Sequence, residues 1–129
     1  ESKSLAVVEQ GMMKGHIEGM HDMNHGVVKF YEKDGYAISR DGYIVKFNPE
    51  TEKVLKEYKT SDSAIGFTVE KNYIAVANYA KKSVDILDRD LNPLQSFETN
   101  SRNVGIKQYK NYLVFSQMDS DKITVLKDK

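Results

Sequence analysis

Three observations predict an all-β protein. A triplet that ends in Tyr recurs along the 129 residues, at Asp34-Gly35-Tyr36, Lys71-Asn72-Tyr73 and Lys110-Asn111-Tyr112. A short apolar run rich in β-branched or aromatic residues follows each triplet, and no segment shows a sustained apolar stripe of helical period. The repeat has a period of about 40 residues, which is typical of the four-stranded antiparallel blades of a β-propeller. An ordinary β-sandwich also has short strands, but it does not predict this period.

The repeat divides the chain into consecutive units. An apolar strand at 5–9 comes first, and we expect it to belong to a closing blade shared by both ends of a ring. A Gly-punctuated loop rich in Met and His is expected at 11–26. Blades are expected at 27–62 and 63–101, followed by an incomplete blade at 102–129. Because propellers close with roughly four to eight blades, we expect the remainder of the ring to come from a longer chain or from other chains.

The order of strands within a unit also follows from the sequence. The third apolar run of each unit precedes a turn residue, and these turn residues, Asn48, Asp88 and Asp128, are 40 residues apart. The fourth runs, at 53–58 and 93–98, are more polar than the others. Greater polarity is expected of an outer edge strand, so these runs are predicted to lie on the outside of their blades.

The composition excludes several classes of function. Nineteen basic residues balance nineteen acidic ones, so the chain has no electrostatic footprint for nucleic acid. The absence of Cys excludes disulfides, a thiolate nucleophile and Cys-ligated metal centres. No apolar run approaches the length of about 18 residues that a membrane span needs.

Residues 11–26 hold all three His and four of the five Met. Three interpretations are open. His25 could be a ligand to a tetrapyrrole iron. The thioether and imidazole groups together could bind copper, although the spacing of His16, His21 and His25 matches no fixed copper or zinc pattern. The Met side chains could instead fill gaps against neighbouring blades.

Other polar candidates lie at the ends of predicted strands. Arg40 follows an inner strand and could point into the propeller channel, where it would pair with a carboxylate. Arg102 opens the first strand of the third unit, and innermost strands line the channel. Asn78 and Asp119 occupy turns after second strands, where turn propensity also explains them. A solvated turn residue is the alternative interpretation for both Arg side chains.

Several short motifs, taken in order, resemble the heme d1-binding propeller family. They are Leu5-Ala6-Val7-Val8-Glu9, Asn24-His25-Gly26, Ser39-Arg40-Asp41-Gly42, Ala77-Asn78-Tyr79, Ser101-Arg102-Asn103-Val104-Gly105 and Val114-Phe115-Ser116. Within this family the chain is most similar to the NirF branch of heme d1 biosynthesis proteins, and the d1 domain of cytochrome cd1 nitrite reductase is more distant. The resemblance spans nearly all of this chain but only about the first third of such a protein.

This resemblance implies an eight-bladed propeller that holds heme d1 or dihydro-heme d1 in its central channel. His25 falls where the family carries the His that faces the iron, which makes it the implied metal ligand and a catalytic candidate. Arg40 and Arg102 fall at positions near the anionic side chains of the macrocycle, and Asn78 belongs to a matching motif. Asp119 lies near a functionally important Asp of the biosynthetic branch.

The implied function is a late step of heme d1 biosynthesis for nitrite reductase, either as an oxidoreductase acting on a precursor or as a carrier. The implied partners are other heme d1 assembly proteins or cytochrome cd1, in the periplasm. The alternative is a β-propeller scaffold for protein partners, with a copper-binding Met/His loop at 12–25.

Overall fold

A computed structural model of the chain describes residues 4–21, 27–39, 41–60, 64–99, 102–117 and 123–127. Within these residues there are thirteen strands. They are β1 (Leu5–Glu9), β2 (Met12–Ile17), β3 (Val27–Tyr31), β4 (Asp34–Ile38), β5 (Tyr43–Asn48), β6 (Lys53–Lys59), β7 (Ala64–Val69), β8 (Ile74–Asn78), β9 (Ser83–Leu87), β10 (Pro93–Glu98), β11 (Asn103–Tyr109), β12 (Tyr112–Gln117) and β13 (Ile123–Lys127). No helix in the described part of the chain is long and apolar enough to cross a membrane.

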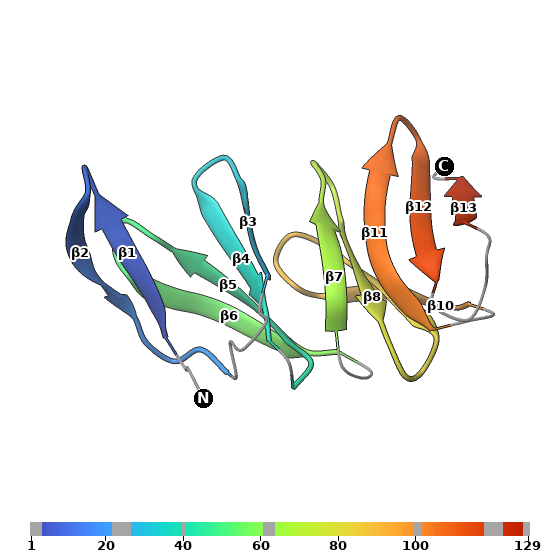
Figure 1. Ribbon diagram of the computed structural model, residues 1–129, viewed down its shortest axis with the longest axis horizontal. Coiled ribbons are helices and arrows are strands. Elements are labelled where there is room, and N and C mark those ends of the chain that lie inside the picture. The colour runs from blue at the N-terminus through green and yellow to red at the C-terminus, as the bar shows by residue number, and fades with distance from the viewer. Residues whose placement is uncertain are drawn as a thin grey trace.

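The strands form four antiparallel sheets, and within each sheet every strand pairs with the next one along the chain. The sheets are β1–β2, β3–β6, β7–β10 and β11–β13. Figure 1 shows them side by side in chain order along the long axis of the molecule. The first strands of the three larger sheets lie next to one another, because β7 contacts both β3 and β11. This is the blade arrangement that the sequence predicts.

Two of the turn residues that are 40 residues apart in the sequence, Asn48 and Asp88, organise equivalent turns, and Asp128 lies outside the described residues. The Asn48 side-chain oxygen accepts hydrogen bonds from the backbone amides of Glu50 at 2.8 Å and Thr51 at 3.2 Å. Asp88 accepts from the amides of Asp90 and Asn92, both at 2.9 Å. The backbone hydrogen bond from Asn92, together with the other amide donors, holds the pKa of the Asp88 carboxyl below its ordinary value.

Apolar side chains fill the spaces between sheets. The largest cluster joins the sheets β3–β6 and β7–β10, and its buried members are Tyr36, Ile38, Ile44, Phe67, Ile74, Val76, Leu87 and Leu91. A second cluster joins β7–β10 to β11–β13 through Ala75, Ala77, Val84, Ile106, Leu113 and Phe115. A third packs β1–β2 against β3–β6 through Ile17, Met20, Ala37, Val45 and Phe47. Burial of these faces supplies the main driving force that holds neighbouring sheets together.

Charged side chains reinforce the first of these contacts at its rim. Arg89 lies 3.3 Å from the Asp34 carboxylate, and its guanidinium carbon is 4.0 Å from the Tyr31 ring centroid. Lys46 of β5 lies 3.1 Å from Asp90 in the turn that follows β9. Burial alone would lower the pKa of Lys46, but the hydrogen bond to Asp90 and the nearby negative charges raise it above its ordinary value.

The segment 11–26 differs from the loop that the sequence predicts. Residues Met12–Ile17 form β2, which pairs with β1 from Leu5↔Ile17 to Glu9↔Met12. A register irregularity between Val7 and Val8 interrupts this pairing. A bulge disturbs the regular alternation of side chains in a strand. The sequence of β2 accordingly shows no clear alternation of apolar and polar residues.

Candidate ligand-binding edge formed by the first strands

A partly buried cation lies where the first strands meet. Lys29 is the central residue of β3, and its Nζ donates a hydrogen bond to the Phe67 carbonyl oxygen on β7 at 2.6 Å. The same Nζ lies 5.4 Å from the centroid of the Phe67 ring. Burial lowers the pKa of Lys29, the positive charge of Lys107 on β11 lowers it further, and Glu70 opposes both effects. An anion bound near Lys29 and Lys107 would reduce this repulsion.

A second cation lies between the end of β8 and the start of β11. Arg102 Nη1 donates a hydrogen bond to the Tyr79 hydroxyl at 3.2 Å, and its guanidinium carbon lies 5.3 Å from the Tyr79 ring centroid. Both side chains are half-buried. A guanidinium held over an aromatic ring keeps a fixed orientation, and its planar donors suit a carboxylate. A contact between Arg102 and an anionic group stays a prediction.

Asn78 is fully buried within its sheet. Its Nδ2 donates to the Ser83 hydroxyl at 3.2 Å and to the Asp85 carboxylate at 3.0 Å. Its backbone carbonyl accepts from Asn103 Nδ2 at 3.0 Å. These bonds join β8 to β9 and to β11, so the structure gives Asn78 a role inside the fold. A contact between Asn78 and a tetrapyrrole stays a prediction.

His25, Arg40 and Asp119 lie outside the described residues. Each belongs to a segment between two described strands: β2 and β3, β4 and β5, and β12 and β13. Consecutive strands are antiparallel, so the end of one strand and the start of the next lie at the same end of a sheet. The strand ends that flank these three segments therefore lie at the same end of the sheets as Asn78, which ends β8, and Arg102, which precedes β11.

The other two His are described, and both lie on or against outer strands. The His21 ring stacks on the Tyr43 ring, with centroids 3.5 Å apart and planes 5° from parallel. His21 Nε2 lies 2.6 Å from the Glu57 carboxylate, and its Nδ1 lies 3.9 Å from that of Asp41. His16 belongs to β2 and lies opposite Ala6 of β1.

The described residues give no support to a copper site. Among them there is no group of three or more His, Asp or Glu side chains that could hold a metal ion. The described part of the proposed copper segment includes β2, where Met12 and Met13 are 76% and 60% exposed. Successive side chains of a strand point to opposite faces, which separates neighbouring potential ligands.

Sequence reasoning proposed Arg102 as a candidate but did not consider Lys29 and Lys107. The available signal was a single Lys inside the apolar run Val27-Val28-Lys29-Phe30 of a first strand. A charged residue in such a run indicates either a solvent-facing position or a binding role. Only the neighbouring strands β7 and β11 show that this Lys is partly buried and near a second cation.

Comparisons with known proteins show the fold. No family model matches the sequence, and no curated protein matches it. The computationally designed protein Ika4 superposes with a TM-score of 0.79 at 14% identity, over 98% of this chain and 81% of that chain. Dihydro-heme d1 dehydrogenase NirN in complex with DHE superposes with a TM-score of 0.75 at 20% identity, over 97% of this chain and 32% of that chain. The β-propeller domain of Myceliophteria thermophila Cps50 (Swd1) superposes with a TM-score of 0.66 at 15% identity, over 78% of this chain and 34% of that chain.

The prediction of an all-β, partial β-propeller is therefore confirmed. The chain spans about a third of the NirN and Cps50 chains. At these identities the likeness does not single out the NirF branch.

Proposed function

We propose that the chain forms part of a propeller that binds an anionic tetrapyrrole of the heme d1 type along the first strands β3, β7 and β11. The observation that carries this proposal is the set of cations at those strands, where Lys29 and Lys107 repel each other and Arg102 is oriented by Tyr79. The fold of NirN, a dehydrogenase solved in complex with DHE, supports the choice of ligand.

The cations fit the acidic side chains of such a macrocycle. Arg102 would bind one carboxylate through two parallel hydrogen bonds, whereas Lys29 and Lys107 would act as point charges. In the same proposal His25 is the iron ligand, Arg40 binds a further carboxylate, and Asp119 acts near the reacting edge. The iron tetrapyrrole would supply any redox chemistry, and the protein would orient it and limit its contact with water.

The proposed physiological role is a late step of heme d1 biosynthesis for nitrite reductase. The protein would act there as an oxidoreductase on a precursor or as its carrier. A periplasmic location, and contact with other heme d1 assembly proteins or with cytochrome cd1, belong to the same proposal.

Titration with dihydro-heme d1, followed by its Soret absorption, tests the binding. We expect Arg102→Ala and Lys29→Met each to weaken binding about 10- to 100-fold, since a charge-assisted hydrogen bond contributes on the order of 1.5–3 kcal/mol. His25→Ala should remove the Soret shift that accompanies iron ligation, and His16→Ala should retain it. Lys53→Ala, which removes an exposed cation from the outer strand β6, is the matched control.

Equal affinity of wild type, Arg102→Ala and Lys29→Met would overturn the proposed edge. An unchanged Soret band in His25→Ala would overturn only the ligand assignment. Retained binding by Lys53→Ala with loss in the other two variants would separate a specific site from nonspecific attraction to positive charge.

A further inference from the structure

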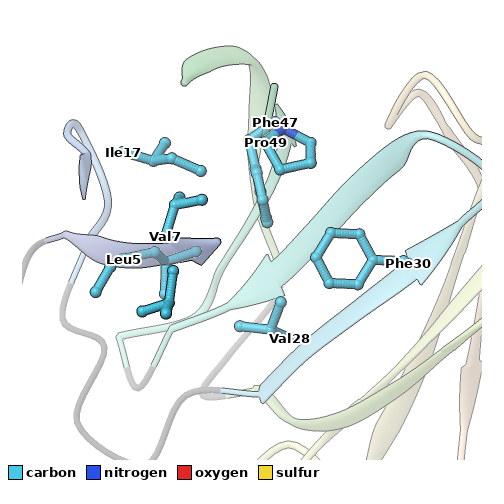
Figure 2. A pocket seen from close by; sticks show the side chains of 9 residues that line it. Leu5, Val7, Ile17, Val28, Phe30, Phe47 and Pro49 are labelled. Atoms are coloured by element: carbon cyan, nitrogen blue, oxygen red, sulfur yellow. The ribbon is translucent and has the colours of Figure 1, made fainter. Parts of the chain in front are cut away.

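The two faces of β3 have different surroundings. Figure 2 shows Val28 and Phe30 on β3 beside an apolar groove that β1 also lines. Successive side chains of a strand point to opposite faces, so Lys29, which lies between these two residues, faces away from the groove. On that other face its Nζ meets the Phe67 carbonyl oxygen of β7 at 2.6 Å. The cation of β3 therefore lies between the first strands of two neighbouring sheets.

The strand pairing aligns further side chains with Lys29. In each of the three larger sheets the first and second strands are joined by a two-residue turn. The residues directly before these turns are Tyr31, Glu70 and Tyr109. Two positions earlier, on the same side of each strand, lie Lys29, Thr68 and Lys107. Because β7 contacts both β3 and β11, these two sets of residues form two rows across the first strands.

The middle strand departs from the repeat in both rows. Lys and Tyr occupy the two positions in β3 and in β11, whereas Thr68 and Glu70 occupy them in the sheet of β7. The Thr68 hydroxyl is buried, at 6% exposure, and donates a hydrogen bond to the Glu70 carboxylate at 2.7 Å. A buried donor of this kind orients the carboxylate that accepts from it. An oriented carboxylate therefore takes the place of a phenol in the middle of the rows.

The charged groups of these rows act on one another. Burial lowers the pKa of Lys29 most, the positive charge of Lys107 lowers it further, and the negative charge of Glu70 raises it. Glu70 therefore lies close enough to Lys29 to offset part of its positive charge. Two lysines and one carboxylate leave these rows with a single net positive charge. A negatively charged group that approaches either lysine is attracted by both of them and repelled by Glu70.

We propose that Glu70 limits how much negative charge this edge accepts, so that the protein takes a tetrapyrrole with few carboxyl groups and discriminates against one with many. A macrocycle with few carboxylates can place one beside Lys29 and keep the others away from Glu70. A macrocycle with carboxylates around its whole periphery has to bring at least one toward Glu70. The inference rests on the proposed tetrapyrrole site and names the class of tetrapyrrole that this site takes.

Two porphyrins that differ chiefly in charge test the inference. Deuteroporphyrin carries a carboxyl group on two of its pyrrole rings, whereas uroporphyrin carries two carboxyl groups on every ring. Binding of each to the full 129-residue chain is followed by Soret absorption at low ionic strength, where charges are weakly screened. Glu70→Gln keeps a hydrogen-bond acceptor for Thr68 and should strengthen uroporphyrin binding about tenfold, but deuteroporphyrin binding by less than about threefold.

Glu98→Gln is the matched control. It makes the same change in net charge at an exposed position of the outer strand β10, and it should alter neither porphyrin affinity. The position of Glu70 is tested without any porphyrin by an NMR titration of the lysine side chains. Glu70→Gln should lower the pH at which Lys29 loses its proton, because the negative charge that raises the pKa of Lys29 is removed. Glu98→Gln should leave that pH unchanged.

The outcomes separate this inference from the proposed site. If Lys29→Met and Arg102→Ala weaken deuteroporphyrin binding but Glu70→Gln changes both porphyrin affinities equally or not at all, the charge-limiting role is overturned and the site stands. If none of the three substitutions changes the affinity for either porphyrin, the site and the inference are overturned together. An unchanged titration of Lys29 in the Glu70→Gln protein would show that Glu70 does not act on this edge, which would overturn the inference alone.

Discussion

The buried amide of Asn103 is predicted to contribute strongly to stability, because it joins β11 to the β8–β9 hairpin. Its Nδ2 donates to the backbone carbonyls of Asn78 at 3.0 Å and Ser83 at 3.1 Å, and its Oδ1 accepts from Gln117 Nε2 at 3.3 Å. Asn103→Ala removes these bonds and leaves the buried Gln117 amide without this acceptor. At about 1 kcal/mol per lost bond, with a further penalty for buried polar groups, the free energy of unfolding should fall by about 2–4 kcal/mol.

Urea unfolding, followed by far-UV circular dichroism and by tyrosine fluorescence, measures this loss. Coincident transitions from the two probes would justify a two-state analysis. Gln95→Ala removes an exposed amide from the outer strand β10 and should change the free energy of unfolding by less than about 0.5 kcal/mol. A similarly small effect of Asn103→Ala would refute the argument that this network stabilises the contact between the sheets.

Two further predictions concern packing and turns. Gly35→Ala should destabilise the protein by about 1–3 kcal/mol, because its new Cβ would collide with the Phe47 ring. Thermal unfolding measures this loss of stability. Phe47→Leu in the Gly35→Ala background should restore part of the lost stability. Asp88→Ala should lower stability near neutral pH whereas Asp88→Asn should be tolerated, since Asn48 organises the equivalent turn. Because the pKa of Asp88 is lowered by folding, the part of its advantage over Ala that depends on its charge exists above the ordinary Asp pKa and should be lost as the pH falls through the folded value. A difference between the two proteins that stays constant down to pH 2 would contradict this.

The repeat is the part of the fold that the sequence predicts well. The recurring Tyr triplets lie at or beside the turns that start β4, β8 and β12, and Asn48 and Asp88 organise equivalent turns. These features are local, because a turn residue acts on backbone groups within a few positions of itself. Local chemistry that recurs at a constant period can be identified without knowing any long-range contact.

Features that depend on distant residues could not be predicted in the same way. β2 was missed because only Ile17 among its six residues is buried, so its sequence lacks an alternating apolar face. Lys29 was missed because its environment comes from Phe67 and Lys107, about 40 and 80 residues further along the chain. Asn78 and Arg102 were both identified as candidates, and only the contacts with Ser83 and Asp85 show that Asn78 supports the fold, whereas a ligand contact of Arg102 stays a prediction.

The pairing of every strand with its neighbour in the sequence has a consequence for how the protein folds. Each sheet closes by short hairpins, so most of its backbone hydrogen bonds form at a low loop-entropy cost and without waiting for other sheets. Cooperativity must then come from the clusters between sheets, as in arrays whose units interact only with nearest neighbours. The sheets β3–β6 and β7–β10, which each pack against a sheet on both faces, should be the last to exchange their amide hydrogens with solvent, and folding should propagate outward from them.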